Sequence, residues 1–542
     1  MNFKRKGITL VGALLLGVVS SQAQVTLPSG LSGNVQIDVQ SYKQDSLIGA
    51  PKVPEKVLSN AFVNLIYKSG NITAGLRYES YANVLQGYNA RYNGNGIMYR
   101  FVEFTKDELT ITAGSFYEQF GSGMVLRTYV EPGLGYDNSL DGVRAKYMKR
   151  GITIKGFIGR QRSYFTYGPG LVRGIDGEVN LNELNPKWAN AKNLVSFGGS
   201  FVSKFQAAND PVYNLPENVG AWAARMNLNR GGFRMYAEYA HKINDPSLVN
   251  NFIYKDGEAL YATIGYSKKG LGFSVSGKRI DNMNFRSDRS ASLTNLNINY
   301  LPAITHQYTY RLATLYPFAT QPNGEIGNSA ELYYTFKPES ALGGHYGTLL
   351  SINGTRVTNI VIKPTFDERG YTSSFFDFTS DAFYSDVNVE ITKKISKKFK
   401  INLNYFYEQY NQAVIEGHPD TPMVYANIGV LEMLYKVNNK NSVRVELQHL
   451  YTKQDRGNWA FGLLEYSVSP NWSFNVFDEY NYGNPDASRQ FHYPSGGIAY
   501  FKNSTRIAVG YGKQRAGLLC VGGVCRYVPA SDGFSLSLTS SF

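Results

Sequence analysis

The sequence has little of what soluble enzymes and helical membrane proteins usually contain. Its 542 residues include only 2 cysteines and 6 histidines, and 18% of them are charged. Beyond residue 23, no apolar run approaches the roughly 20 residues that a transmembrane helix needs. These shortages argue against a cysteine-rich metal site and against a bundle of membrane helices.

The motifs of common enzyme classes are also missing. There is no Walker loop, no dinucleotide fingerprint, no HExxH metal motif and no serine-centred elbow. The Asp/Gly-rich stretch 174–183 lacks the ligand spacing of an EF-hand. "GHPD" places His418 beside Asp420 in a predicted external loop. This pair alone is weak support for a hydrolase, which is the least supported of the three functions that we consider. We expect no catalytic residues, no metal and no cofactor.

The formal net charge of +13 raises the question of nucleic-acid binding. No basic run stands out, and the Lys/Arg pairs fall at predicted turns such as "KRG" (149–151) and "KKG" (268–270). Solvated turns explain such pairs more simply than a binding surface does. We therefore expect no nucleic-acid partner.

The N-terminus has the pattern of an export signal. Lys4, Arg5 and Lys6 precede an apolar run from Ile8 to Val19, and small residues follow around Ala23. A run of about 12 apolar residues is too short to span a bilayer, so a secretory signal peptide over residues 1–23 is favoured over an anchor. In an exported chain, Cys520 and Cys525 of "CVGGVC" favour a disulfide that closes a small loop.

What the sequence does have is aromatic residues, glycine and alternation. There are 41 Tyr, 31 Phe and 54 Gly. The ending "GFSLSLTSSF" alternates apolar and polar residues, and "KFKINLNYFYEQY" (398–410) and "SVRVELQHLY" (442–451) repeat the pattern. Charged residues share the polar face and no amphipathic helices cover the apolar one. A transmembrane β-barrel, with lipid outside and water inside, explains both faces.

The connections support this interpretation, because very short turns alternate with long polar loops, as in outer-membrane barrels. We predict an all-β, antiparallel transmembrane barrel over residues 24–542 with about 24 strands, from 31–43 to 531–542, and any even number from 20 to 24 fits the pattern. Phe542 would then be the C-terminal aromatic by which the barrel-assembly machinery recognises its substrates for insertion.

The ending "SQAQ" of the signal, the Tyr-rich strands, "FGSGMVLRTYVEPGLGYDNSLDGVRAKY" (120–147) and the closing "SLTSSF" resemble the uncharacterised porin-like outer-membrane barrel proteins of Bacteroidetes-type bacteria. The resemblance covers essentially the whole mature chain. It implies the fold and an outer-membrane location. No activity and no functional residues come with it.

Alternation places several charged side chains on the predicted inner face. A ladder of ion pairs that braces the wall is one interpretation, and a mild preference for anionic solutes is the other. The lumen candidates are Arg77, Arg144, Lys155, Arg225, Arg234, Glu238, Arg444, Glu446 and Arg506.

A lumen enclosed by more than 20 strands would be wide, and barrels of this size are typically plugged. No plug domain precedes the first predicted strand, so we expect long loops to narrow the lumen. The candidates are 119–139, 163–171, 282–327 and 356–381. In the first of these, Arg127 opposite Glu131 or Asp137 would create a transverse field, with Tyr129 nearby. The alternative is that the loops only cap the barrel.

The sequence thus predicts an outer-membrane channel for small hydrophilic solutes. The alternative is a structural or secretion-associated barrel that docks partner proteins through its loops. The sequence does not identify the solute, the oligomeric state or a partner.

Overall fold

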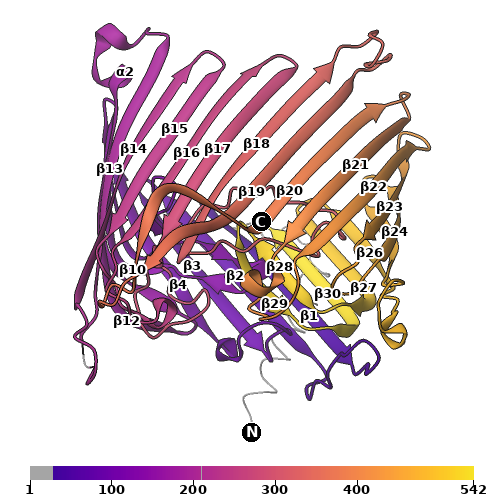
Figure 1. Cartoon of the computed structure of the whole chain (residues 1–542), viewed down its shortest axis with the longest axis horizontal. Helices are drawn as coiled ribbons and strands as arrows, with labels where there is room; N and C mark the ends of the chain where they lie inside the picture. Colours follow the sequence, from indigo (N-terminus) through magenta and orange to yellow (C-terminus); the bar gives the residue numbers. More distant parts are fainter. Residues whose placement is uncertain (1–27, 209) are drawn as a thin grey trace.

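The computed structural model describes residues 28–208 and 210–542, so the predicted signal peptide (1–23) lies outside the described residues. One antiparallel sheet of 24 strands closes on itself, because β1 pairs with β2 on one side and with β30 on the other. Figure 1 shows the tilted strands forming the wall, with other segments of the chain inside it. The predicted all-β barrel of about 24 strands is confirmed.

The barrel strands follow one another around the wall in chain order. They are β1 (Leu31–Lys43), β2 (Leu58–Ser69), β3 (Ile72–Ala82), β4 (Gly94–Lys106), β5 (Leu109–Phe116), β10 (Leu140–Lys149), β11 (Ile152–Ser163), β12 (Thr166–Asn180), β13 (Asn193–Phe205), β14 (Asn218–Arg230), β15 (Phe233–Lys242), β16 (Gly257–Lys268), β17 (Leu271–Asp281), β18 (Gly324–Phe336), β19 (Thr348–Pro364), β20 (Tyr371–Lys394), β21 (Phe399–Tyr410), β22 (Val424–Lys436), β23 (Asn441–Tyr451), β24 (Trp459–Val468), β25 (Trp472–Tyr480), β26 (Ser495–Lys502), β27 (Thr505–Gln514) and β30 (Ser531–Ser541).

Helices are few and short in the described residues. They are α2 (Leu181–Leu184), α3 (Gln412–Ile415) and the 3-10 turns η1 (Ala90–Tyr92), η2 (Pro132–Leu134), η3 (Pro186–Trp188), η4 (Leu248–Asn250) and η5 (Ala487–Arg489). None of the helices in the described residues has the length and apolar character needed to cross a membrane.

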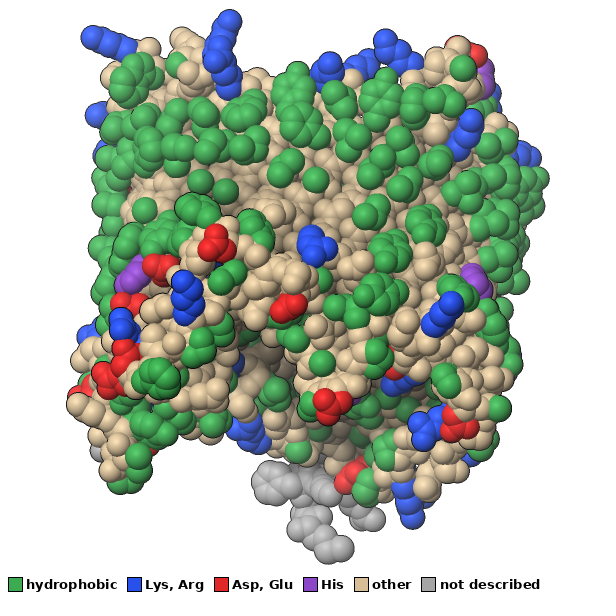
Figure 2. Space-filling model, in the orientation of Figure 1, with side chains coloured by type: hydrophobic (Ala, Val, Ile, Leu, Met, Phe, Trp, Pro, Cys, Tyr) green, Lys and Arg blue, Asp and Glu red, His purple; other side chains and the backbone are tan. Residues whose placement is uncertain are grey.

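The two faces of the wall differ as the alternation predicts. In β21, Leu403 and Tyr405 are 47% and 49% exposed, whereas Asn402 and Asn404 are buried on the inner face. The outer surface carries a broad band of apolar side chains with charged residues gathered above and below it (Figure 2). Exposed aromatic residues stand beside the short turns, namely Tyr334, Tyr435, Tyr466 and Trp472. This is the exterior that a bilayer requires.

The two ends of the barrel also differ. One end, uppermost in Figure 1, has mostly short connections, such as residues 70–71 between β2 and β3, and we call it the turn end. The other, the loop end, carries long connections, of which residues 282–323 between β17 and β18 form the longest. Because antiparallel neighbours alternate direction, both chain ends of the barrel domain, Leu31 and Ser541, lie at the turn end.

Two of the segments predicted to narrow the lumen do not do so. Residues 163–171 mostly continue β11 and β12, which are joined by a tight turn at 164–165. Residues 356–381 extend β19 and β20 into a long hairpin, where Ile360 still pairs with Phe378. Both predictions were wrong because backbone pairing continues through these polar stretches instead of ending in a loop.

The extension of β19 and β20, residues 359–381, lies against the outside of the wall, and we call it the outer hairpin (Figure 1). Tyr371 donates a hydrogen bond to Asp281 (2.6 Å), and the Arg279 guanidinium lies 4.6 Å from the ring centre of Phe375. Arg279 and Asp281 share the face of β17 on which Val275 is exposed to the surroundings of the barrel. The outer hairpin therefore covers an ion pair on the lipid side of the wall, near the loop end.

Candidate functional site

Three segments fold into the barrel from the loop end. We call them the first inner loop (117–139), the long inner loop (282–323) and the terminal hairpin (515–530). The first contains the short strands β6 (Gln119–Phe120), β7 (Leu126–Arg127), β8 (Val130–Glu131) and β9 (Tyr136–Asp137), and the last contains β28 (Gly517–Val521) and β29 (Val524–Val528). Sequence reasoning predicted the first two and missed the hairpin.

The first inner loop packs on an apolar strip of the inner wall. Phe120, Met124 and Leu126 are fully buried against small wall side chains, including Ala221 and Ala240. The alternation of β14 and β15 places these alanines on the inner face, opposite the exposed Trp222 on the outer one. Small inward side chains leave room for a loop, so this strip fixes where the loop lies.

The loop is also tied down by charge. Glu118 pairs with Arg144 (3.5 Å) and with Lys155 (2.9 Å), both of which are on the inner wall. Glu238 accepts a hydrogen bond from the backbone N–H of Ser122 (2.7 Å). These three wall residues were lumen candidates from the sequence, and the structure has them holding the first inner loop.

Asp137 lies in a buried network of two arginines and two carboxylates. It pairs with Arg77, and with Arg162 at 2.9 Å. Arg162 also pairs with Glu79 at 2.6 Å, and Arg77 pairs with Glu79 at 2.8 Å. The two positive and two negative charges compensate one another, which a buried network needs in order to be stable. The network locks the loop to β3 and β11.

The other candidates in the first inner loop are arranged differently from the sequence expectation. The Arg127 guanidinium lies over the rings of Tyr129 (4.7 Å) and Tyr300 (4.1 Å), while Asp137 is engaged by the wall arginines instead. Glu131 accepts the backbone N–H of Gly133 (3.2 Å). Arg127 is thus held by aromatic faces rather than by a carboxylate, and it joins the first inner loop to the long one.

The long inner loop crosses the lumen and contacts the opposite wall. The Tyr310 hydroxyl accepts hydrogen bonds from Asn402 (2.8 Å) and Asn404 (3.2 Å) of β21. Leu312 is fully buried, and its backbone N–H donates to Gln448 (2.8 Å). A second apolar strip of the inner wall, which includes Phe406, Val424, Ala426, Ile428 and Leu450, receives this part of the loop.

His306 anchors the same loop through a titratable contact. Its Nδ1 lies 3.4 Å from a carboxylate oxygen of Glu331. The hydrogen bond with Glu331 raises the pKa of His306, and the negative charges of Asp386 and Glu390 act in the same direction, whereas burial opposes them. The imidazolium form therefore favours the docked loop.

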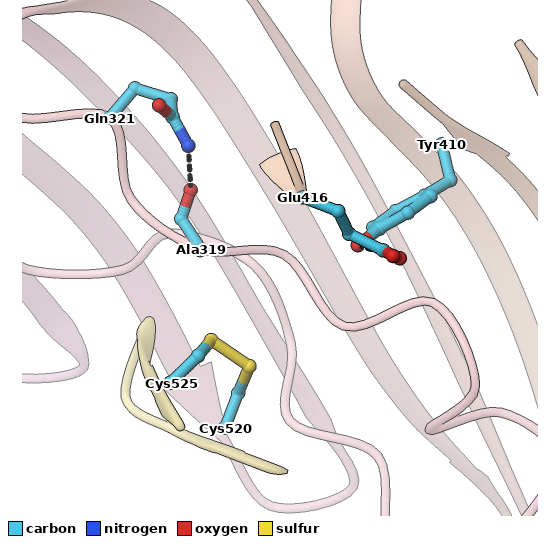
Figure 3. Close-up of a disulfide and its surroundings, with 6 residues drawn as sticks. All are labelled: Ala319, Gln321, Tyr410, Glu416, Cys520 and Cys525. Atoms are coloured by element: carbon cyan, nitrogen blue, oxygen red, sulfur yellow. Dashed lines mark hydrogen bonds between the residues drawn. A yellow bond between two sulfur atoms is a disulfide. The ribbon is translucent and has the colours of Figure 1, made fainter. Parts of the chain in front are cut away.

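The terminal hairpin stands in the middle of the lumen (Figure 1). Cys520 and Cys525 face each other across β28 and β29 and form a disulfide (Figure 3). The long inner loop holds the tip of the terminal hairpin. The Tyr300 hydroxyl donates to the carbonyl of Gly522 (2.7 Å), and the backbone N–H of Thr320 donates to the carbonyl of Gly523 (3.2 Å).

A single buried carboxylate connects the base of the hairpin to the long inner loop. Glu479 of β25 is 0% exposed and accepts hydrogen bonds from Arg311 (2.7 Å) and Arg515 (2.6 Å). Sequence reasoning did not single out Glu479 or Arg515. The sequence did contain a hint. The alternation in β25 places Glu479 on the inner face near the loop end, where a charged side chain is expected to face another part of the chain.

The remaining lumen candidates lie on the wall itself. Arg225 pairs with Asp176 (2.7 Å) and Glu178 (2.9 Å). Arg444 pairs with Glu446 and with Glu432 (2.9 Å). Arg234 and Arg506 are exposed and have no carboxylate within ion-pair distance among the described residues. The wall therefore contains ion-pair ladders with a few free arginines towards the turn end.

Two cavities flank the terminal hairpin, one of about 700 Å³ and a larger one of about 1060 Å³. Both are lined by Tyr88, Arg515 and Arg526, so the terminal hairpin stands between them. Two further cavities, of about 530 and 300 Å³, lie between the first inner loop and the wall. Figure 3 shows the disulfide beside the segment 319–321, with Glu416, which lines the larger cavity, and its hydrogen-bond partner Tyr410 further away.

The other sequence candidates lie at the larger cavity or at the end of the barrel wall. His418 Nδ1 lies 3.6 Å from Glu416, and both side chains line the larger cavity. Residues 28–208 and 210–542 contain no group of three or more His, Cys, Asp or Glu side chains that could hold a metal ion. Phe542 pairs through its backbone with Gly33 of β1, and its ring is about half exposed at the turn end.

Comparison with solved structures gives low similarities. The siderophore receptor PirA from Pseudomonas aeruginosa is 10% identical, with a TM-score of 0.42, over 95% of this chain and 81% of the receptor. A mutant of the ferric enterobactin receptor PfeA from the same species, in complex with enterobactin, is 11% identical, with a TM-score of 0.43, over 95% and 82%. OccAB4 from Acinetobacter baumannii is 8% identical, with a TM-score of 0.34, over 95% and 99%. None of the three carries a conclusion about this chain.

No curated protein matches the sequence. One family model does match, over residues 5–542, and it is described as a family of unknown function, DUF6029. The expected resemblance to a family of uncharacterised barrel proteins is confirmed. Because the match covers nearly the whole chain, the protein belongs to the DUF6029 family.

Proposed function

We propose that the protein is an outer-membrane channel of the porin type, which passes small hydrophilic solutes through a lumen narrowed by its inner loops. The observation that carries this proposal is the pair of cavities, about 700 and 1060 Å³, that flank the terminal hairpin inside a wall with a polar inner face. Rings of charge and a constriction are the elements that set selectivity in pores.

The apolar exterior supports a location in a bilayer, and the signal-like N-terminus supports the outer membrane. Lipid would then contact the outer face, and the barrel-assembly machinery would insert the chain, with Phe542 as its recognition signal. The inner loops support a non-enzymatic role, since their charged side chains mainly bind one another and the wall.

A planar bilayer experiment tests the channel. Purified protein should give steady single-channel conductance, and replacing residues 516–529 with a short Gly-Ser linker should enlarge it, because the two cavities would merge. Shortening the loop 484–490 provides the control, since among the described residues this loop lines neither cavity. Silence from folded, heat-modifiable protein, both intact and without the hairpin, would refute the channel.

The alternative is a barrel that docks a partner protein. The outer hairpin favours it, because Phe366 and Phe376 of that hairpin are strongly exposed. A docking barrel should be closed when pure, and deletion of residues 516–529 should leave partner binding intact. Replacement of both phenylalanines by Ser should then abolish binding without changing conductance.

A further inference from the structure

Tyrosines and arginines are prominent in the lining of the larger cavity. Its lining includes the rings of Tyr92, Tyr129, Tyr136 and Tyr300. Tyr129 and Tyr136 lie with their ring centres 4.8 Å apart, and Tyr300 meets Tyr129 edge-on at 6.0 Å. The volume of about 1060 Å³ matches the upper range of small-molecule sites, which are about 300 to 1,000 Å³.

Arg286 brings a buried positive charge to this cavity. The residue is 4% exposed, and it donates hydrogen bonds to Asn284 Oδ1 (2.7 Å), to the carbonyl of Asn295 (2.8 Å) and to the carbonyl of Leu293. All three acceptors are neutral, and no carboxylate lies within ion-pair distance among the described residues. Burial lowers the pKa of Arg286 to about 10, so the side chain is still charged at neutral pH.

Arg526 of the terminal hairpin brings a second such charge. Its Nε donates to the carbonyl of Gly133 (3.0 Å), and its guanidinium lies 4.3 Å from the ring centre of Tyr88. Burial lowers the pKa of Arg526 as well, and again no carboxylate pairs with it in the described part of the chain. Of the arginines that line the cavity, Arg286 and Arg526 are therefore the ones that are at least partly buried and lack a negative partner among the described residues.

The acidic groups around the cavity are already engaged. Asp137 belongs to the network with Arg77 and Arg162. Glu416 and Asp455 accept hydrogen bonds from the hydroxyls of Tyr410 and Tyr316, respectively. Buried charges are normally paired or hydrogen-bonded to an ion of opposite sign, because an isolated one is costly to desolvate. These carboxylates are therefore not available to neutralise Arg286 and Arg526, and an anionic ligand could do so.

We propose that the larger cavity is a binding site for a small organic anion that carries an aromatic or sugar ring. Arg286 and Arg526 would bind the anionic group by charge-assisted hydrogen bonds, and the tyrosine faces would pack on the ring. This inference rests on the proposed channel and names its solute class.

Binding to the full-length mature protein in nanodiscs tests the site without requiring conduction. The probes are 4-hydroxybenzoate with its neutral amide for the aromatic class, and digalacturonate with neutral galactobiose for the sugar class, each titrated calorimetrically against protein and empty nanodiscs. We expect one anion to bind at least tenfold more tightly than its neutral counterpart, and the pair that shows this identifies the ring. No preference in either pair would overturn the proposal.

Variants separate a specific site from general charge. Arg526→Gln and Arg286→Gln should each weaken anion binding tenfold or more, and Arg286→Lys should weaken it less. Arg150→Gln, the same change in an exposed turn at the turn end, should leave the affinity unchanged. If Arg286→Gln does not fold, Arg526→Gln and Arg286→Lys decide, and wild-type affinity in both refutes the site.

Conductance of the same samples keeps the two proposals distinct. Anion binding in a protein that never conducts supports the site and refutes the channel. Conduction without any preference for the anions refutes the site and leaves the channel.

Discussion

Replacement of Glu479 by Gln should release two inner loops at once and increase conductance. The Glu479 carboxylate is 0% exposed and binds Arg311 of the long inner loop and Arg515 at the base of the terminal hairpin, one with each oxygen. Gln has nearly the same size, so the change removes charge without creating a cavity. It also leaves one of the two arginines facing an amide NH2 group, which donates hydrogen bonds instead of accepting them.

The structure sets the size of the effect. A hydrogen bond to a charged group contributes about 1.5–3 kcal/mol, and loss of one partner of a buried pair costs about 3–5 kcal/mol. Arg311 is 33% exposed, so solvent weakens the contribution of its ion pair with Glu479. An overall loss of about 3 kcal/mol shifts the equilibrium between docked and released loops by roughly a factor of 100.

Single-channel recording measures this shift directly. Glu479→Gln should show frequent large openings that are rare in the wild type, and proteolysis within 515–530 should become faster because the released hairpin is exposed. The matched control is Glu465→Gln. Glu465 faces the lumen from the adjacent strand β24, but it pairs with Arg444 of the wall at 3.8 Å, and in the described part of the chain it makes no hydrogen bond or ion pair with an inner loop. Its replacement should leave conductance and proteolysis unchanged.

The reasoning fails if folded Glu479→Gln protein conducts and resists protease as the wild type does. It also fails if Glu465→Gln produces the same openings, since lumen charge rather than loop release would then be responsible.

Three further predictions concern the other anchors. Asp137→Asn should lower the unfolding free energy by about 3 kcal/mol in denaturant titrations, because it leaves two buried arginines with one carboxylate. Asp141→Asn breaks a pair with the exposed Arg100, so it should cost about 1 kcal/mol or less. Replacement of both Cys520 and Cys525 by Ser should remove about 2 kcal/mol of hairpin stability, and a reductant should increase conductance of the wild type but not of this variant. Because the pKa of His306 is raised in the folded protein, its contribution to loop docking is full below about pH 6.5 and is lost as pH rises through the raised pKa; conductance should therefore increase from pH 6 to 9, and His306→Gln should flatten the profile.

The wall could be predicted from the sequence because its signals are local. Alternation within each strand identifies the two faces, and the short turns identify neighbours, so β21 and its inward Asn402 and Asn404 follow from one stretch of 13 letters. The antiparallel pairing of β1 with β30 that closes the barrel then follows from an even strand count.

The inner loops could not be placed in the same way, because their partners are distant in the chain. Glu479 meets Arg311 across 168 residues, and Arg162 meets Glu79 across 83. Such pairs become visible only after the strands are arranged around the wall. Sequence reasoning proposed Arg127 opposite Asp137 because they are near in sequence, yet Arg77 and Arg162 reach Asp137 from the wall. The small inward alanines of β14 and β15 were the available hint.

The three inner segments are not held equally, and this decides which one can act as a gate. The first inner loop has fully buried apolar side chains such as Met124, and the long inner loop has Leu312. In the terminal hairpin, the buried apolar side chain within the described residues is Ala530. Its other anchors are polar: hydrogen bonds at the tip, the contacts of Arg526 with Gly133 and Tyr88, and one ion pair at the base. Segments with few buried apolar contacts open at the lowest free energy. Since both cavities border this hairpin, its release would join them while the first inner loop stayed in place.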